Sequence, residues 1–144
     1  MSLVLNVQTQ SGGSSVQPDE RMTYTLFLRN NTNGVLTNVV VTDAIDDAVV
    51  NYVRNSANPP LDSSSTVPLP LHRISDSELL EATQNLVWKF ATVNPGETKV
   101  MSFQVVVLKA AVTNGVTSIN NNATASSTQT GNVSFVSNGV NNPL

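Results

Sequence analysis

The sequence contains no cysteine, so neither a disulfide framework nor a thiolate metal site is available to its 144 residues. Charged residues make up only 12% of the chain, and its formal net charge of -3 comes without a basic cluster. Because phosphate binding needs a positive surface, we expect no nucleic acid partner. No apolar run approaches the roughly 18 residues that cross a bilayer, so we expect no membrane insertion by this segment.

The uncharged polar residues are dominated by Asn, Ser and Thr. These residue types favour turns and solvated strand faces. Combined with so few charges, this balance is typical of an extracellular β protein. The length falls in the usual range of one domain, so we treat residues 1–144 as a single unit.

Apolar and polar residues alternate with a period of two along most of the chain, which is the pattern of strands with one buried face. The two longest runs cover residues 22–28 and 101–107, and shorter ones occupy 3–7, 39–43, 49–54, 86–90, 119–125 and 133–136. About seven to eight short strands with turn signals between them predict an all-β fold, an antiparallel sandwich rather than a barrel.

The predicted core is centred on Trp88, the single tryptophan of the chain. Phe90 has the same parity as Trp88, while Tyr24 and Phe103 occupy inward positions of the two longest runs. An exposed tryptophan is also a platform for sugar stacking, but a second aromatic residue on the same face favours core packing. We therefore expect Tyr24, Trp88, Phe90 and Phe103 to form an aromatic core.

Residues 57–85 interrupt the strand pattern and read as one long loop. Prolines at positions 59, 60, 68 and 70 exclude a central strand there. Within the loop, residues 75–78 have the spacing of a helix capping box, which together with 79–81 predicts one or two helical turns. We expect a domain core over about 3–127, this loop, and a C-terminal extension over 128–144.

Several short motifs follow one another in a recognisable order. A Pro turn with alternating Thr, Tyr and apolar residues spans 17–30, T-N-V-V-V-T-D spans 37–43, and the lone Trp88, N-P-G-E at 94–97 and N-N-A-T at 121–124 follow. From about Val16 to Ser126 the chain resembles the bacterial surface repeat known as domain of unknown function 11. The resemblance implies an immunoglobulin-like sandwich, an extracellular location on a bacterial surface, and no family-wide catalytic site.

Asp43, Asp46 and Asp47 cluster after a predicted strand. Grouped loop carboxylates are how oxygen-liganded calcium sites are built, although this spacing is not that of an EF-hand. Asp62 or Asp76 from the long loop would have to complete such a shell. The other interpretation is a solvated turn in which Asp43 caps local backbone donors. Calcium is the one candidate cofactor of the chain.

A Lys–Asn cross-link is a second candidate site, because some surface sandwiches join a desolvated Lys amine to an Asn amide beside a buried acid. Lys109 continues the inward parity of the 101–107 run, and Asn121 has inward parity on the next run. The competing interpretation places the Lys109 ammonium in water at the sheet margin. Asn121, if buried, has to find hydrogen-bond partners, and we expect it to tie its strand to a neighbouring loop.

These observations predict a non-catalytic structural or adhesive module, one unit of a larger surface or secreted protein. Its expected partners are neighbouring domains and a host or cell-wall protein or glycan. The alternative is a calcium-stabilised, carbohydrate-binding or protein-binding module that uses the Asp43 loop or the 57–85 loop. An enzyme is not expected, because the only histidine, His72, follows Pro68 and Pro70 in the long loop without a nucleophile elbow nearby.

Overall fold

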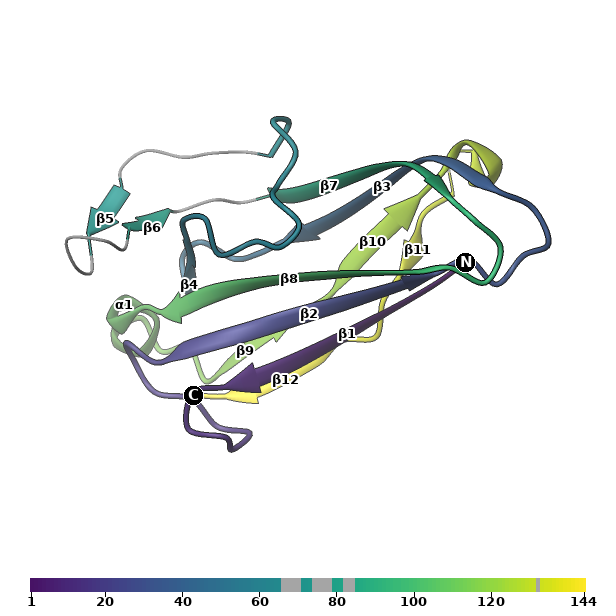
Figure 1. Cartoon of the computed structure of the whole chain (residues 1–144). Helices are drawn as coiled ribbons and strands as arrows, with labels where there is room; N and C mark the ends of the chain where they lie inside the picture. The colour runs from purple at the N-terminus through teal and green to yellow at the C-terminus, as the bar shows by residue number, and fades with distance from the viewer. Residues whose placement is uncertain (66–70, 74–78, 82–84, 132) are drawn as a thin grey trace.

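The computed structural model describes residues 1–144 except 66–70, 74–78, 82–84 and 132 (Figure 1). The first sheet has the order β1 (Ser2–Thr9), β2 (Arg21–Arg29), β8 (Thr98–Val107), β4 (Val50–Val53), β6 (Leu79–Glu81), β5 (Leu71–Arg73). The second has the order β11 (Phe135–Val136), β10 (Ala123–Ser126), β3 (Leu36–Ala44), β7 (Asn85–Val93). A third sheet pairs β12 (Val140–Pro143) with β9 (Ser118–Asn121), and α1 (Lys109–Thr113) and the 3-10 turn η1 (Thr128–Thr130) are short.

The strict alternation of β2 and β8 produces the centre of the first sheet. In β2 every second residue from Met22 to Leu28 is buried, and β8 repeats the pattern from Met101 onward. The antiparallel register places Tyr24 opposite Phe103, and their ring centroids lie 5.3 Å apart. Aromatic pairs at this separation add to the free energy gained from burying their area.

The second sheet covers this surface through β3 and β7. Val41 of β3 and Trp88 of β7 are register partners, and both side chains are buried. The Trp88 ring lies 5.8 Å from that of Phe103, so the aromatic residues join the two layers. Two antiparallel sheets facing one another over a common core confirm the predicted immunoglobulin-like β-sandwich.

The first part of the long loop is packed against both sheets. Asn58 exchanges backbone hydrogen bonds with Ser102 of β8 at 2.8 and 2.9 Å, and Asp62 N–H donates to the Val87 carbonyl of β7. The Trp88 Nε1–H donates to the Pro59 carbonyl at 2.9 Å. Residues 57–65 therefore close the side of the sandwich between β8 and β7, and Leu61 packs against the core.

The predicted helix in this loop is wrong where the structure describes it. Residues 79–81 form strand β6, which pairs with β4 and with β5. Residues 75–78 lie outside the described residues. Pairing with two neighbouring strands outweighs the local capping signal, because propensity is weak compared with tertiary context.

The predicted C-terminal extension belongs to the fold. Strand β11 pairs with β10, and β12 pairs with β9. Between them, Asn138 reaches the outer edge of β1, where its amide accepts from the Leu5 N–H and donates to the Leu5 carbonyl, each at 2.9 Å. Residues 133–143 thus cover sheet edges that would otherwise be open to pairing with another chain.

The two ends of the chain lie at opposite ends of the long axis of the sandwich (Figure 1). Strand β1 begins at one end, near β11 and η1, while β12 finishes at the other, near α1. No helix in the described residues has the length and apolar character that crossing a membrane requires.

Candidate functional site: a buried Asp43–Asn121 pair beside a cavity

The candidate site is formed by polar side chains inside the core. Asp43 lies on the inward face of β3, two residues after the buried Val41, and its side chain is fully enclosed. Asn121, the last residue of β9, is also buried, and its Nδ2–H donates to Asp43 Oδ2 at 2.9 Å. The hydrogen bond connects strands of two different sheets.

The environment of Asp43 favours its neutral form. Burial raises the pKa of this carboxyl to about 7, and the hydrogen bond from Asn121 offsets only part of that effect. A carboxylate taken out of water loses its hydration, and one amide donor does not replace it. Asp43 is therefore a carboxylic acid that titrates near neutral pH within the core.

Tyr24 of β2 completes the cluster from the opposite sheet. Its side chain is 1% exposed. Burial, and then the nearby Asp43 charge, hold the pKa of its phenol above the ordinary range. Among the described residues, Tyr24 Oη, Asp43 Oδ1 and Asn121 Oδ1 have no hydrogen-bond partner. Unpaired buried polar atoms are uncommon in folded proteins, so this concentration marks the site as unusual.

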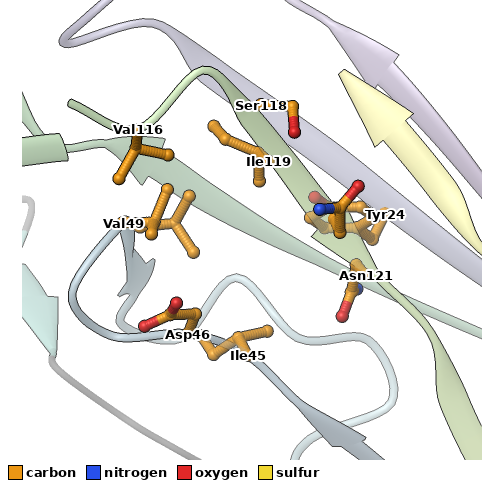
Figure 2. Close-up of a pocket in the computed structure, with 10 residues that line it drawn as sticks. Tyr24, Ile45, Asp46, Val49, Val116, Ser118, Ile119 and Asn121 are labelled. Atoms are coloured by element: carbon orange, nitrogen blue, oxygen red, sulfur yellow. The ribbon is translucent and has the colours of Figure 1, made fainter. Parts of the chain in front are cut away.

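A cavity of about 170 Å³ adjoins the pair (Figure 2). Tyr24 and Asn121 line one end of it, and Val49 and Val116 lie at the other. Its wall comes from the segment between β3 and β4, from β9 and the turn that precedes it, and from β2. The cavity therefore lies where the two layers meet β9, at the end of the sandwich that carries α1.

The structure does not support the predicted calcium site. Asp43 faces the core, whereas Asp46 is in the following turn and accepts the Ala48 N–H at 3.0 Å. No three acidic or histidine side chains form a metal-sized group in the described part of the chain, so Asp43, Asp46 and Asp47 are not a common ligand set. The turn interpretation holds for Asp46. Asp43 instead pairs with Asn121 and not with local backbone donors.

The predicted Lys109–Asn121 cross-link is wrong in its lysine. Strand β8 ends at Val107, and Lys109 begins α1, so the inward parity of the strand does not continue to it. Its side chain is 77% exposed and its Nζ lies 3.3 Å from Asp19 Oδ2. The other two lysines, Lys89 and Lys99, form surface ion pairs with Asp62 and Glu97. Asn121 is buried as expected, but it ties β9 to β3 and not to a loop.

The aromatic core is confirmed for three of its four predicted members. Tyr24, Trp88 and Phe103 are at most 1% exposed. Phe90 is only partly buried, and the Lys99 ammonium lies 5.5 Å above its ring, so it packs at the margin of the core. The Trp88 indole is enclosed and hydrogen-bonded to Pro59, which excludes the sugar-stacking alternative for this residue.

The pairing of Asp43 with Asn121 was missed from sequence, although a signal for it existed. Val39, Val41 and Asp43 share one parity, so the alternation that buries the two valines also turns Asp43 inward. The same alternation predicts that the Asn121 side chain points into the core. Two inward polar residues on different strands need each other as partners, and this requirement could have joined them.

The fold is shared with solved structures of very different sequence. The N-terminal domain of the Streptococcus gordonii adhesin Sgo0707 matches at a TM-score of 0.57 and 13% identity over 99% of this chain. The full-length major pilin SpaD of Corynebacterium diphtheriae matches at a TM-score of 0.54 and 19% identity over 96% of this chain. AvmM, which catalyses macrocyclization in alchivemycin A biosynthesis, matches at a TM-score of 0.51 and 8% identity over 99% of this chain.

These similarities establish the fold alone. The chain spans 32% of the adhesin chain and 35% of the pilin chain, about a third of each, and 87% of AvmM. No family model matches the sequence. No curated protein matches it either, so the resemblance to domain of unknown function 11 is not confirmed. What these comparisons define is a fold, an immunoglobulin-like sandwich that also occurs in an adhesin domain, a pilin and AvmM.

Proposed function

We propose that the chain is a non-catalytic structural module of a bacterial cell-surface or secreted protein, one unit of a stalk that presents an adhesive surface. The observation that carries this proposal is the position of the two chain ends at opposite ends of the sandwich (Figure 1). Modules linked through such ends line up end to end. The similarity to an adhesin domain and to a pilin supports the same role.

The terminal strands are attached in a way that suits tension along this axis. β1 pairs with β2 over eight consecutive register pairs, from Ser2 with Arg29 to Thr9 with Met22. A pull on the N-terminal end acts along β1, so these pairs are loaded together. At the other end β12 pairs with β9, and Asn142 Nδ2–H donates to the Ser14 carbonyl at 2.8 Å. Both ends are thus held by several hydrogen bonds that share the load.

Single-molecule force spectroscopy tests the proposal directly. Since the chain has no cysteine, attachment points can be introduced as Ser2→Cys with Pro143→Cys, which applies force from end to end. The matched control is Ser2→Cys with Asn31→Cys, which pulls β1 away from the adjacent end of β2 and breaks the pairs one at a time. We expect the end-to-end unfolding force to be several times the peeling force. Equal forces in the two geometries would overturn the stalk role.

Neighbouring domains of the parent protein, and a host or wall component, remain the proposed partners. A binding role for the first part of the long loop is less favoured, because residues 57–65 are hydrogen-bonded to β7 and β8. An extracellular bacterial location and membership of the surface-repeat family are part of the same proposal. They are supported by the low charge, the motif order and the fold.

A further inference from the structure

The cavity beside Asn121 has walls suited to an alkyl chain. Aliphatic side chains form much of its lining, namely Ile45, Val49, Val50, Val116 and Ile119. An apolar cavity of about 150 Å³ is large enough to hold a benzene molecule. The cavity of about 170 Å³ is therefore large enough for a short unbranched alkyl group.

One end of the cavity differs from the rest because it is polar and holds unpaired oxygen atoms. Tyr24 and Asn121 line this end (Figure 2), and they are 1% and 7% exposed. Within the described residues, Tyr24 Oη and Asn121 Oδ1 have no hydrogen-bond partner, and neither has Asp43 Oδ1, on the residue that accepts from Asn121 and lies outside the cavity wall. The Asn121 amide oxygen only accepts hydrogen bonds, and the Tyr24 hydroxyl oxygen accepts as well as donates, so a donor from a ligand can serve both.

A primary ammonium group is the donor that answers this need. It carries three N–H donors and no acceptor on one atom, so it can donate to both unpaired oxygens of residues in the cavity wall, Tyr24 Oη and Asn121 Oδ1. Hydrogen bonds from a charged donor are roughly twice as strong as neutral ones. We propose that this cavity binds a primary alkylammonium group, with the alkyl chain against the aliphatic wall and the ammonium at the Tyr24–Asn121 end.

The charges around the cavity favour a cation. The side chain of Asp46 also lines it, and the chain as a whole carries a formal charge of -3. Asp43 does not line the cavity, but it accepts a hydrogen bond from Asn121 and adds a second negative charge next to that amide when it ionises, with its pKa raised to about 7. The three unpaired oxygens are closed to solvent, so binding has to open the Tyr24–Asn121 end by a side-chain movement. A free alkylamine and a lysine side chain of a partner protein offer the same chemical group.

An NMR titration of the amide signals tests the proposal and separates these two sources. The probes are n-pentylammonium chloride, the uncharged analogue n-pentanol, and a lysine with both backbone ends blocked, all at constant ionic strength. We expect saturable shifts over residues 45–50 and 116–121 with pentylammonium, and binding of pentanol at least about tenfold weaker, since it lacks the charge and two of the donors. If the blocked lysine binds about as tightly as pentylammonium, the site is assigned to the lysine side chain of a partner protein. If the blocked lysine does not bind while pentylammonium does, the site is assigned to a free amine.

Variants at the polar end supply the second measurement. Tyr24→Phe and Asp43→Asn each keep the shape of the side chain, and we expect each to weaken pentylammonium binding by about tenfold while changing pentanol binding little. The matched control is Tyr52→Phe, a buried tyrosine outside the cavity wall whose oxygen accepts the Ala57 N–H at 3.2 Å. This variant should bind as the unmodified protein does.

Three results would overturn the inference: no saturable shift with pentylammonium, equal affinity for pentanol, or unchanged affinity in both polar-end variants. Equal affinity for pentanol would identify a plain apolar cavity. The inference goes beyond the stalk role and is independent of it, because the pulling experiment does not involve the cavity. Either proposal can therefore fail while the other stands.

Discussion

The titration of Asp43 leads to a prediction about stability and pH. In the unfolded chain this carboxyl ionises around its ordinary pKa of 3.8, whereas in the folded protein burial raises the pKa to about 7. Between these values the folded state holds a proton that the unfolded state has lost. Stability therefore falls as pH rises through this window, and it stops falling above the folded pKa.

The size of the effect follows from the two values. Each pKa unit corresponds to about 1.4 kcal/mol, so the free energy of unfolding should drop by about 4 kcal/mol between pH 4 and pH 8. Asp43→Asn replaces the acid by a neutral group of the same shape, and this component should vanish. Subtracting the variant's pH profile from that of the unmodified protein isolates Asp43, since distant groups contribute equally to both.

Urea unfolding followed by the fluorescence of Trp88, the single tryptophan, provides the assay from pH 4 to pH 8.5. Asp62→Asn is the control, because hydrogen bonds from Ser64 and the charge of Lys89 lower the pKa of this exposed carboxyl. Its effect has the opposite sign, as a lowered pKa adds stability when pH rises. Parallel profiles for the unmodified protein and Asp43→Asn would refute the assignment of a neutral buried acid.

Three further predictions concern the cross-link, calcium and the C-terminal segment. The intact mass should equal the sequence mass without loss of ammonia, because Lys109 is at the surface beside Asp19; a deficit of one ammonia in denaturing mass spectrometry would contradict this. The melting temperature should be the same with calcium as with chelator, since only an ion bound to the folded state raises it. A rise with calcium would show that the loop around Asp46 binds the ion after all. Asn138→Ala should lower the free energy of unfolding by about 1 to 2 kcal/mol, because two hydrogen bonds to Leu5 are lost. Urea unfolding measures this change, with Asn141→Ala as a surface control. Equal free energies of unfolding for the two variants would contradict the prediction.

Sequence alternation predicted the sandwich because burial of one strand face is written directly into every second residue. It worked for β2 and β8, where Tyr24 and Phe103 meet as expected. The alternation gave a wrong prediction where a strand ends, because a period-two pattern does not show at which residue the strand stops. Lys109 kept the parity of β8 on paper, but the chain had already turned into α1. The prediction of a helix at 79–81 was wrong for a different reason. These residues form strand β6, whose pairing with β4 and β5 depends on tertiary contacts that a local capping signal does not contain.

The candidate site was half predictable. Inward parity placed Asn121 in the core, and the same rule applied to Asp43, yet grouping it with Asp46 and Asp47 by sequence proximity suggested a loop ligand instead. Adjacent strand residues point to opposite faces, so proximity in sequence is a poor guide to shared sites within β structure. The cavity could not be predicted at all, because its wall combines β2, β9 and the segment after β3.

A buried acid and amide contribute little net stability compared with apolar residues of the same volume, so their presence calls for another explanation. Strand β12 carries the C-terminal end of the chain and pairs with β9, and β9 ends at Asn121. Asn121 then hydrogen-bonds Asp43 at the end of β3, in the middle of the second sheet. The chain continues from β9 through residue 122 into β10, and β10 pairs with β3 from Ala123 opposite Asp43. The Asn121–Asp43 hydrogen bond therefore adds a second connection between β9 and β3 at the point where the chain passes from one sheet to the other.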